Sequence, residues 1–337
     1  ANIEPFVSGV QKAIFGFGSV SNSFKNVTNL VSSTGIVASD TTGVGTARFR
    51  LAAAGYGGDK AIFGFGSTGM YSGGTNITNL VSNAGVVATD TTGVGSARQR
   101  LAAASYGGDK AIFGFGYGEG TGFPGDTRPD LTSITNLVSN AGVVASDTTG
   151  VGTARTHSAA AKYGSGKAIF GFGSTDSGYT SVTNLVSNTG VVASDTTGVG
   201  VKRFNLAAAG YGGDKAIFAF GGQSAPKTNT NSYNGNSYTN NYYQDETSDT
   251  ICLVSNLGVV ASDTTGVGTA RTDAAAAGYG GDKAIFGFGE ARGEVYYTQT
   301  INNFTNLVSN TGVIGSHTYG VGAARSSLAA ASYSTTA

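Results

Sequence analysis

The stretch Lys60-Ala-Ile-Phe-Gly-Phe-Gly66 recurs along the whole chain with few changes. A run such as Leu51-Ala-Ala-Ala-Gly-Tyr56 precedes most copies, and a run such as Thr78-Asn-Leu-Val-Ser-Asn83 follows them. The six copies occupy residues 12–18, 60–66, 110–116, 167–173, 215–221 and 283–289. Self-similarity with a period of roughly 50 residues is typical of repeat architectures. The sequence therefore predicts a repeat protein, and each unit is best interpreted as one structural module.

Each unit predicts four short strands. In the second unit these strands cover residues 51–56, 60–65, 77–82 and 86–92. Aromatic and β-branched residues fill the runs, and no helical period with caps is present. Four short strands per unit are typical of a propeller blade. We expect an all-β fold, a six-bladed β-propeller of four-stranded antiparallel blades, forming one domain over residues 1–337.

The second strand of each unit alternates large and small side chains. Period-two alternation predicts that Phe63 and Phe65 share one face of the strand and that Gly64 lies on the other. A phenylalanine of one blade could then meet a glycine of the next across the gap between them. Burial of the paired phenylalanines would supply a sizeable core although the chain has no Trp.

The two ends of the chain suggest how the ring closes. The last unit finishes with residues 328–333, a consensus first strand with no second strand after it. The first unit starts at its second strand, and the preceding Ile3–Ser8 fits a first strand badly. We expect residues 328–333 to pair with residues 13–17, which would close the ring and remove exposed strand edges.

Almost all variation in length falls in the connections between the second and third strands. The long connections are 117–133, 223–250 and 290–304. Because strand direction alternates, these connections share a face with the segments that lead from one unit into the next. Variable loops on a rigid scaffold are where binding is usually placed. We therefore expect the working surface on this face.

Two of these long connections are rich in tyrosine. The tyrosines are Tyr233, Tyr238, Tyr242, Tyr243, Tyr296 and Tyr297. Tyrosine and asparagine together make a good binding composition, because rigid amphipathic rings combine with adaptable hydrogen bonds. The candidate partners are another protein subunit or a host-surface glycan or receptor, and a polar low-complexity loop without a partner is the remaining alternative.

One arginine precedes the first strand of each unit. The six are Arg48, Arg98, Arg155, Arg203, Arg271 and Arg325. They could form a cationic ring at the mouth of a channel, where an anion would bind. Their occurrence in every unit favours a structural role instead, with each arginine paired to the aspartate of a unit. The position corresponding to Asp40 is His317 in the last unit, so one arginine would lack its expected partner.

Composition argues against several functions. The net charge is zero and only 12% of residues are charged, so there is no basic surplus to bind nucleic acid. The chain has no apolar run long enough for a membrane-spanning helix and no signal-peptide pattern. His157, His317 and Cys252 are too few and too scattered for a metal site or for acid–base catalysis. We expect a protein that is not an enzyme and uses no cofactor or metal.

The pattern of an arginine, Leu-Ala-Ala-Ala and Lys-Ala-Ile-Phe-Gly-Phe-Gly resembles the kelch repeat over nearly the whole chain. Only the fifth unit has the family's glycine pair, Gly221-Gly222, and the family's Trp is absent. The chain also looks like glycine-rich kelch-like repeats encoded by marine bacteriophages. That resemblance implies a virion protein, such as a tail fibre, baseplate or other appendage. The alternative is an extracellular, lectin-like propeller of cellular origin that binds carbohydrate.

Overall fold

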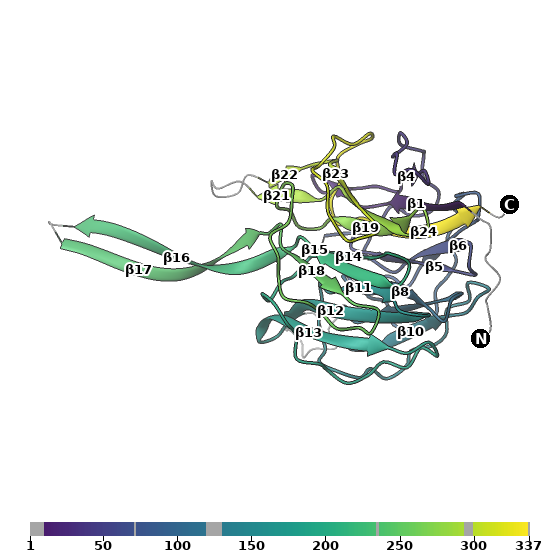
Figure 1. Ribbon diagram of the computed structural model, residues 1–337, viewed down its shortest axis with the longest axis horizontal. Coiled ribbons are helices and arrows are strands. Elements are labelled where there is room, and N and C mark those ends of the chain that lie inside the picture. The colour runs from purple at the N-terminus through teal and green to yellow at the C-terminus, as the bar shows by residue number, and fades with distance from the viewer. Residues whose placement is uncertain (1–9, 71, 119–129, 234–235, 293–298, 336–337) are drawn as a thin grey trace.

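The computed structural model describes residues 10–70, 72–118, 130–233, 236–292 and 299–335, and within these ranges strands are the only regular elements. Six antiparallel sheets of three strands follow one another along the chain (Figure 1). In each sheet a middle strand pairs with an inner strand on one side and a third strand on the other. The predicted all-β architecture with repeating strand spacing is confirmed.

The same register recurs in every sheet. The inner strands are β5 (Ala52–Tyr56), β8 (Ala102–Tyr106), β11 (Ala159–Tyr163), β14 (Ala207–Tyr211), β19 (Ala275–Tyr279) and β24 (Ala329–Thr335). The middle strands are β1 (Val10–Gly16), β6 (Lys60–Gly64), β9 (Lys110–Gly114), β12 (Lys167–Thr175), β15 (Lys215–Ala219) and β20 (Lys283–Gly287). The third strands are β4 (Thr28–Val31), β7 (Thr78–Val81), β10 (Thr135–Val138), β13 (Gly178–Val186), β18 (Ile251–Val254) and β23 (Thr305–Val308).

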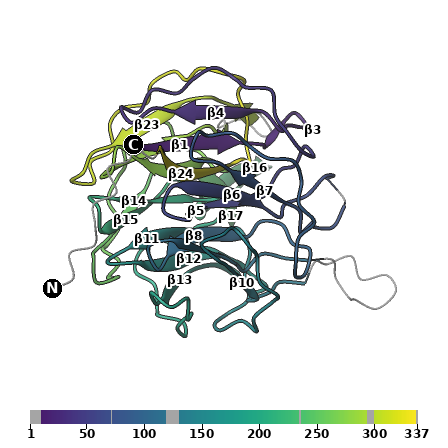
Figure 2. The same cartoon turned by 90° about the vertical axis from the view of Figure 1, so that its right-hand side faces the viewer.

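The last strand of the chain lies in the same sheet as the first. β24 pairs antiparallel with β1, with Ala13 opposite Ser332 and Gly16 opposite Ala329. The predicted pairing of the C-terminal segment with residues 13–17 is confirmed for residues 329–332. Each inner strand also contacts the inner strand of the next sheet, in the order β24, β5, β8, β11, β14, β19 and again β24. Figure 2 shows successive sheets lying one beside another.

A phenylalanine with left-handed backbone follows five of the middle strands and, as Phe172, lies within β12. The φ angles of Phe17, Phe65, Phe115, Phe172, Phe220 and Phe288 lie between 62° and 65°. This conformation turns the ring to the other side of the sheet, so Phe63 packs with Ile14 and Phe17 while Phe65 packs with Phe113. The expectation that Phe63 and Phe65 share one face was therefore wrong.

Phenylalanine pairs join neighbouring sheets. Phe65 and Phe113 have ring centroids 5.1 Å apart, and equivalent pairs lie between 5.1 and 5.5 Å, including Phe288 with Phe15 of the first sheet. The expected contact of a large with a small residue is confirmed at Gly64. A Cβ atom added there would lie 2.8 Å from Cζ of Phe113. Any larger residue at Gly64 would push the two sheets apart.

The fourth strand predicted for each unit is not a regular strand. In the second unit, residues 86–92 make only two isolated bridges, Val81 with Val87 and Thr78 with Thr91. Between these bridges the side chain of Asn79 donates its Nδ2 hydrogens to the carbonyl of Ala88 and to Asp90. Side-chain hydrogen bonds therefore replace part of the backbone ladder of a fourth strand. The sheets are three-stranded rather than four-stranded.

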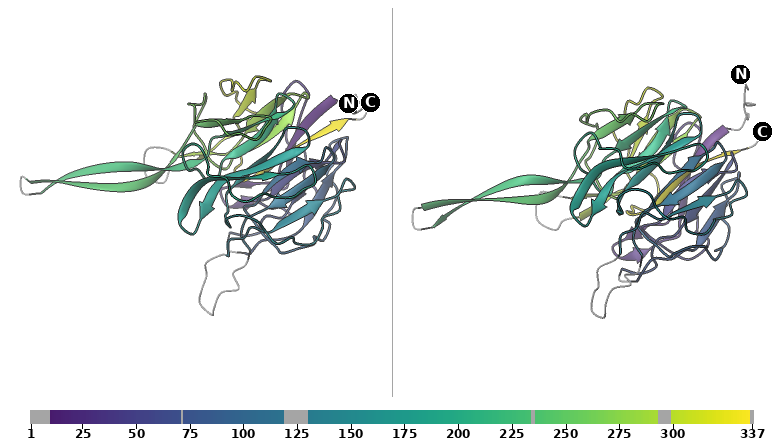
Figure 3. Two further views of the ribbon diagram at one scale, coloured as in Figure 1. Left: turned by 60° about the horizontal axis from the view of Figure 1, so that its bottom comes forward. Right: turned by 90° about the horizontal axis from the view of Figure 1, so that it is seen from below.

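The connection 223–250, expected to be a loop, is mostly a long hairpin. Strands β16 (Gly222–Tyr233) and β17 (Asn236–Thr247) pair along their whole length, from Gly222 opposite Thr247 to Tyr233 opposite Asn236. The hairpin projects far beyond the body, away from the edge where β1 begins and β24 ends (Figures 1 and 3). The sequence signal was Asn234-Gly235, a dipeptide typical of tight hairpin turns.

The other connections are shorter. β2 (Ser19–Val20) pairs with β3 (Ser23–Phe24), and β21 (Glu290–Arg292) pairs with β22 (Gln299–Ile301) within the predicted connection 290–304. In the connection 117–133 a bridge joins Tyr117 and Leu131. Residues 119–129 and 293–298 of these two connections lie outside the described residues.

Candidate functional site

The arginine that precedes each inner strand is buried between two sheets. Arg48, Arg98, Arg155, Arg203, Arg271 and Arg325 are all no more than 1% exposed. Arg155 lies over the ring of Phe115 in the preceding sheet, 3.9 Å from its centroid, and donates to Oδ1 of Asn184 in its own sheet at 2.7 Å. The other five lie 4.0 to 5.0 Å from an equivalent ring. These buried arginines therefore do not form an exposed cationic ring.

An asparagine stands between most arginines and their aspartates. Asn184 donates to Oδ1 of Asp195 at 2.8 Å, and Asp195 also accepts from the hydroxyl of Thr153, in the linker from the preceding sheet, at 2.6 Å. Within the described ranges, a direct ion pair is present only for Arg203 with Asp263 and for Arg325 with Asp40, at 3.7 and 3.2 Å. The expectation that each arginine pairs directly with an aspartate was therefore wrong. In most units the repeated asparagine lies between the two and bonds to both.

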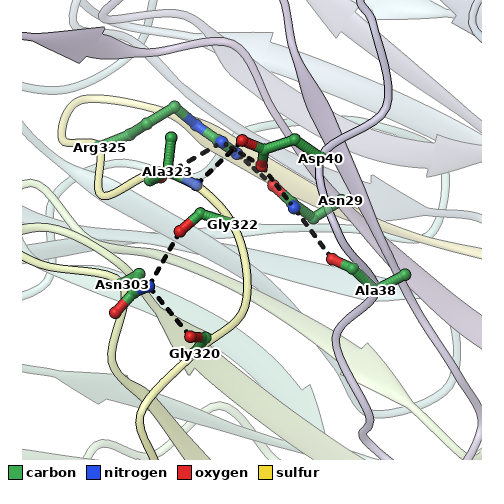
Figure 4. A network of polar contacts seen from close by, with 8 residues as sticks. All are labelled: Asn29, Ala38, Asp40, Asn303, Gly320, Gly322, Ala323 and Arg325. Atoms are coloured by element: carbon green, nitrogen blue, oxygen red, sulfur yellow. Dashed lines mark hydrogen bonds and ion pairs between the residues drawn. The ribbon is translucent and has the colours of Figure 1, made fainter.

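We call this repeated set the Arg–Asn–Asp cluster. Figure 4 shows the member that joins the end of the chain to its beginning: Arg325 donates to Asn29 at 2.6 Å and to Asp40. The backbone amide of Ala323 also donates to Asp40, at 2.9 Å. Burial lowers the pKa of Arg155 to about 10, a value at which the guanidinium stays charged at neutral pH. The cluster therefore fixes each linker to the sheet that it enters.

Two sheets depart from this pattern. In the fifth sheet Cys252 replaces the asparagine, accepts from Arg203 at 2.7 Å and lies 2.6 Å from Asp263. In the sixth sheet Arg271 keeps its bond to Asn306 at 2.7 Å, but His317 replaces the aspartate. His317 stacks on Phe304, with centroids 4.6 Å apart, so an aromatic contact takes the place of the carboxylate.

A second set of residues follows each buried arginine by two positions. We call it the mouth ring: Arg50, Arg100, His157, Asn205, Asp273 and Ser327. All six have φ between 51° and 57°, a left-handed conformation that is uncommon outside glycine and that Asn, Asp and His adopt more readily than other residues. The repeat leaves this position variable, whereas the buried arginine beside it is constant. The mouth ring was not predicted from the sequence, because the predictions were based on positions that are the same in every unit.

Backbone hydrogen bonds connect the mouth ring into a cycle. The amide of Arg100 donates to the carbonyl of Arg50 at 2.8 Å, and the amide of His157 donates to the carbonyl of Arg100 at 3.0 Å. The chain of bonds continues through Asn205 and Asp273 to Ser327, whose carbonyl accepts from Arg50 at 2.8 Å. These bonds hold the six α-carbons in a fixed arrangement, so the side chains differ in chemistry but not in placement.

The side chains of the mouth ring divide into two sides. On one side lie Arg50, Arg100 and His157, and a hydrogen bond joins Arg100 to Nε2 of His157. Burial, with the charges of Arg100 and Arg50, lowers the pKa of His157 well below 6.5, so this histidine is neutral at pH 7. On the other side, Asp273 accepts from Asn205 and from Ser327, each at 2.9 Å.

The mouth ring forms the floor of a basin of about 410 Å³. Part of the wall comes from connections between middle and third strands, with Ser19, Asn22, Met70, Ser174, Tyr179 and Glu290. The expectation that these connections share a face with the linkers between units is therefore confirmed. Aromatic rings complete the wall: Tyr179 stacks on Phe204 at 4.2 Å, and the guanidinium of Arg50 lies 4.4 Å from the centroid of Phe49.

The predicted tyrosines are not part of this basin. Tyr233 lies in β16, and Tyr238, Tyr242 and Tyr243 lie in β17, all on the projecting hairpin. Tyr296 and Tyr297 lie outside the described residues. The basin uses a different tyrosine, Tyr179, whose hydroxyl donates to Asp245 of β17 at 2.7 Å. This bond ties the base of the hairpin to the wall of the basin.

Few groups in the described ranges have the chemistry of a catalyst or metal site. No cluster of three or more His, Cys, Asp or Glu residues there could hold a metal ion. Burial raises the pKa of Cys252 to about 12, so its thiol stays protonated. No helix within those ranges is long and apolar enough to cross a membrane.

No protein-family model matches the chain, and no curated protein matches it.

Proposed function

We propose that the chain is a closed six-bladed β-propeller that acts as a non-enzymatic interaction module. Three observations support closure: the pairing of β24 with β1, the cyclic order of contacts between inner strands, and the cycle of backbone bonds through the mouth ring. A closed ring has no exposed inner edges, so it is a rigid support for whatever its faces present.

The contact arm of this module is the β16–β17 hairpin. Beyond the bridge of Gly222 at its base, its two strands of 12 residues pair only with each other in the described chain. An isolated two-stranded hairpin is marginally stable in water, and its unpaired backbone edges are templates for another strand. The arm is fixed at its base by a bridge between Gly222 and Phe204 and by the bond of Tyr179 to Asp245. A protein partner that packs on or pairs with the arm would complete it.

The partner that we propose is another subunit of the same particle. The resemblance to phage-encoded repeats implies a virion, with the arm used in a tail fibre, baseplate or other appendage. A host-surface glycan or receptor is the other partner that such an appendage would meet. The basin favours a second candidate function, a lectin-like extracellular propeller. Its wall carries aromatic side chains, and its polar floor carries groups that can form hydrogen bonds with sugar hydroxyls.

The test replaces the arm with the shortest hairpin that the chain itself provides. In the fourth sheet Ser174 lies opposite Tyr179 and bridges to Thr156, just as Gly222 lies opposite Thr247 and bridges to Phe204 in the fifth. Residues 223–246 can therefore be exchanged for residues 175–178 without a change of register. We expect the melting temperature to stay within a few degrees, while incorporation into particles, measured by co-sedimentation, is lost.

The matched control exchanges a different long connection. In the third sheet Tyr117 and Leu131 form a bridge in the equivalent place, so residues 118–130 can be shortened in the same way. We expect this variant to be incorporated normally. If the variant without the arm is also incorporated and adsorbs to host cells, the contact surface lies elsewhere on the molecule.

A further inference from the structure

The floor of the basin concentrates positive charge on one side. Arg50 and Arg100 are close enough for the charge of Arg100 to lower the pKa of Arg50, although burial is the larger cause. Their hydrogen-bond partners in the described ranges are neutral: Arg50 bonds to Gln99 at 3.3 Å and to Tyr117, and Arg100 contacts the neutral His157. The charge of Asp273 attracts Arg50 but forms no direct ion pair with it among the described residues. Two half-buried guanidiniums held side by side without a bonded carboxylate favour a bound anion.

The opposite side of the floor is suited to hydroxyl groups. Each carboxylate oxygen of Asp273 accepts one hydrogen bond within the described residues, from Ser327 or from Asn205. A carboxylate oxygen has two acceptor sites, so each oxygen can accept a second donor from a ligand. Glu290 adds another acidic side chain to the same wall. These carboxylates repel a doubly charged phosphate but accept hydrogen bonds from hydroxyls.

The walls are suited to the flat, less polar face of a small ring. Tyr179 is half-buried against Phe204, and Met70 and Ile301 lie in the same lining. The volume of about 410 Å³ falls within the range of small-molecule sites. A ligand that combines one carboxylate, several hydroxyls and a compact ring satisfies the two sides of the floor and the wall together.

We propose that the basin binds an acidic saccharide, with its carboxylate on Arg50 and Arg100 and its hydroxyls on Asn205 and Asp273. This assignment rests on the carbohydrate-binding branch of the proposed function and does not depend on the arm. The mouth ring sets the specificity, because its backbone is fixed by the cycle of hydrogen bonds while its side chains are unique to each unit.

The experiment titrates the full chain with glucuronic acid, glucose and inorganic phosphate, and measures binding by isothermal titration calorimetry. We expect glucuronic acid to bind in the millimolar range and to bind more tightly than either of the others. The variants Arg50→Gln and Arg100→Gln should each weaken glucuronic acid binding about tenfold or more, the effect of losing a charge-assisted hydrogen bond.

The control variant Lys60→Gln/Lys110→Gln removes two positive charges from the middle strands while leaving the mouth ring intact. It should bind glucuronic acid as the parent chain does. Equal binding of phosphate, equal binding of glucose, or an equal loss in the control would each overturn the assignment, as would no binding of glucuronic acid. The variant without the arm loses the bond of Tyr179 to Asp245 but keeps the stacking of Tyr179 on Phe204. It should therefore still bind the sugar acid, so failure of the arm hypothesis and failure of this one give different results.

Discussion

The buried arginine and the mouth-ring residue lie two positions apart in every linker, yet they follow opposite rules. The first is always arginine, is no more than 1% exposed and is bonded to its own sheet. The second is arginine, arginine, histidine, asparagine, aspartate or serine, and it faces the basin. In this repeat protein, constancy identifies the residues that hold the sheets together. Variation at a fixed backbone position identifies the residues that are available for recognition.

The sharpest way to break this comparison is to remove one arginine of each kind. Arg155→Met should lower the free energy of unfolding by about 1–3 kcal/mol, because the buried Oδ1 of Asn184 would lose its donor. Arg100→Met should cost under about 1 kcal/mol, since its guanidinium is only half-buried. Denaturant unfolding monitored by circular dichroism measures both.

The same two variants can also contradict this interpretation. If Arg100→Met destabilised the chain as much as Arg155→Met, the mouth ring would be part of the framework rather than a recognition surface. The variant Arg155→Lys is the matched control for charge. It keeps a cation but loses the planar fork that reaches both the Phe115 ring and Asn184, so it should remain clearly destabilised.

The sequence was sufficient for most of the framework. Repetition predicted the all-β class and the pairing of residues 329–332 with β1, because a recurring pattern reports backbone geometry directly. It failed where one residue has an unusual backbone angle: alternation placed Phe63 and Phe65 together, but φ of 64° at Phe65 sends the rings to opposite sides. It also failed at Asn79, whose side chain bonds substitute for a fourth strand.

The candidate site was largely invisible in the sequence. The mouth ring is assembled from six positions spread over the chain, from Arg50 to Ser327, and no local motif marks them. Only their spacing, two positions after each buried arginine, identifies them. That spacing points to a site only once the structure shows that the six linkers converge at one place. The four described tyrosines were assigned to the correct connection, but they lie on a projecting hairpin instead of a surface loop.

Acid pH should weaken the contribution of the Arg–Asn–Asp cluster to stability. Burial acts to raise the pKa of Asp147, but hydrogen bonds from Ser96 and Asn136 and the charge of Arg98 outweigh it and hold the pKa below 3.8. A carboxylate with a depressed pKa stabilises the fold above the unfolded pKa, and that contribution is lost as pH falls through the folded pKa. Stability from the cluster should therefore be constant near neutrality and decline below about pH 4.

The variant Asp147→Asn isolates this effect. It should be less stable than the parent chain at pH 7, and the difference should shrink as the pH falls through the folded pKa of Asp147. Thermal unfolding followed over a pH series measures the difference. A difference that stayed constant down to the lowest pH would mean that the charge of Asp147 does not contribute and that only its shape matters.

The smallest expected effect comes from repairing the one cluster that lacks its asparagine. In the fifth sheet, Cys252 accepts from Arg203 and lies against Asp263 through a thiol, and sulfur is a weak hydrogen-bonding group. Cys252→Asn would restore the amide that the other five sheets use, with an oxygen toward Arg203 and a donor toward Asp263. Net hydrogen bonds of this kind contribute about 1 kcal/mol, so we expect the unfolding free energy to rise by about that amount. Cys252→Ser is the matched control, because a hydroxyl is too short to reach both partners and should bring no gain. If Cys252→Asn were destabilising, the apolar packing of Cys252 beside Phe218 and Val254 would outweigh the polar cluster, and that cluster would hold this pair of sheets less firmly than the others.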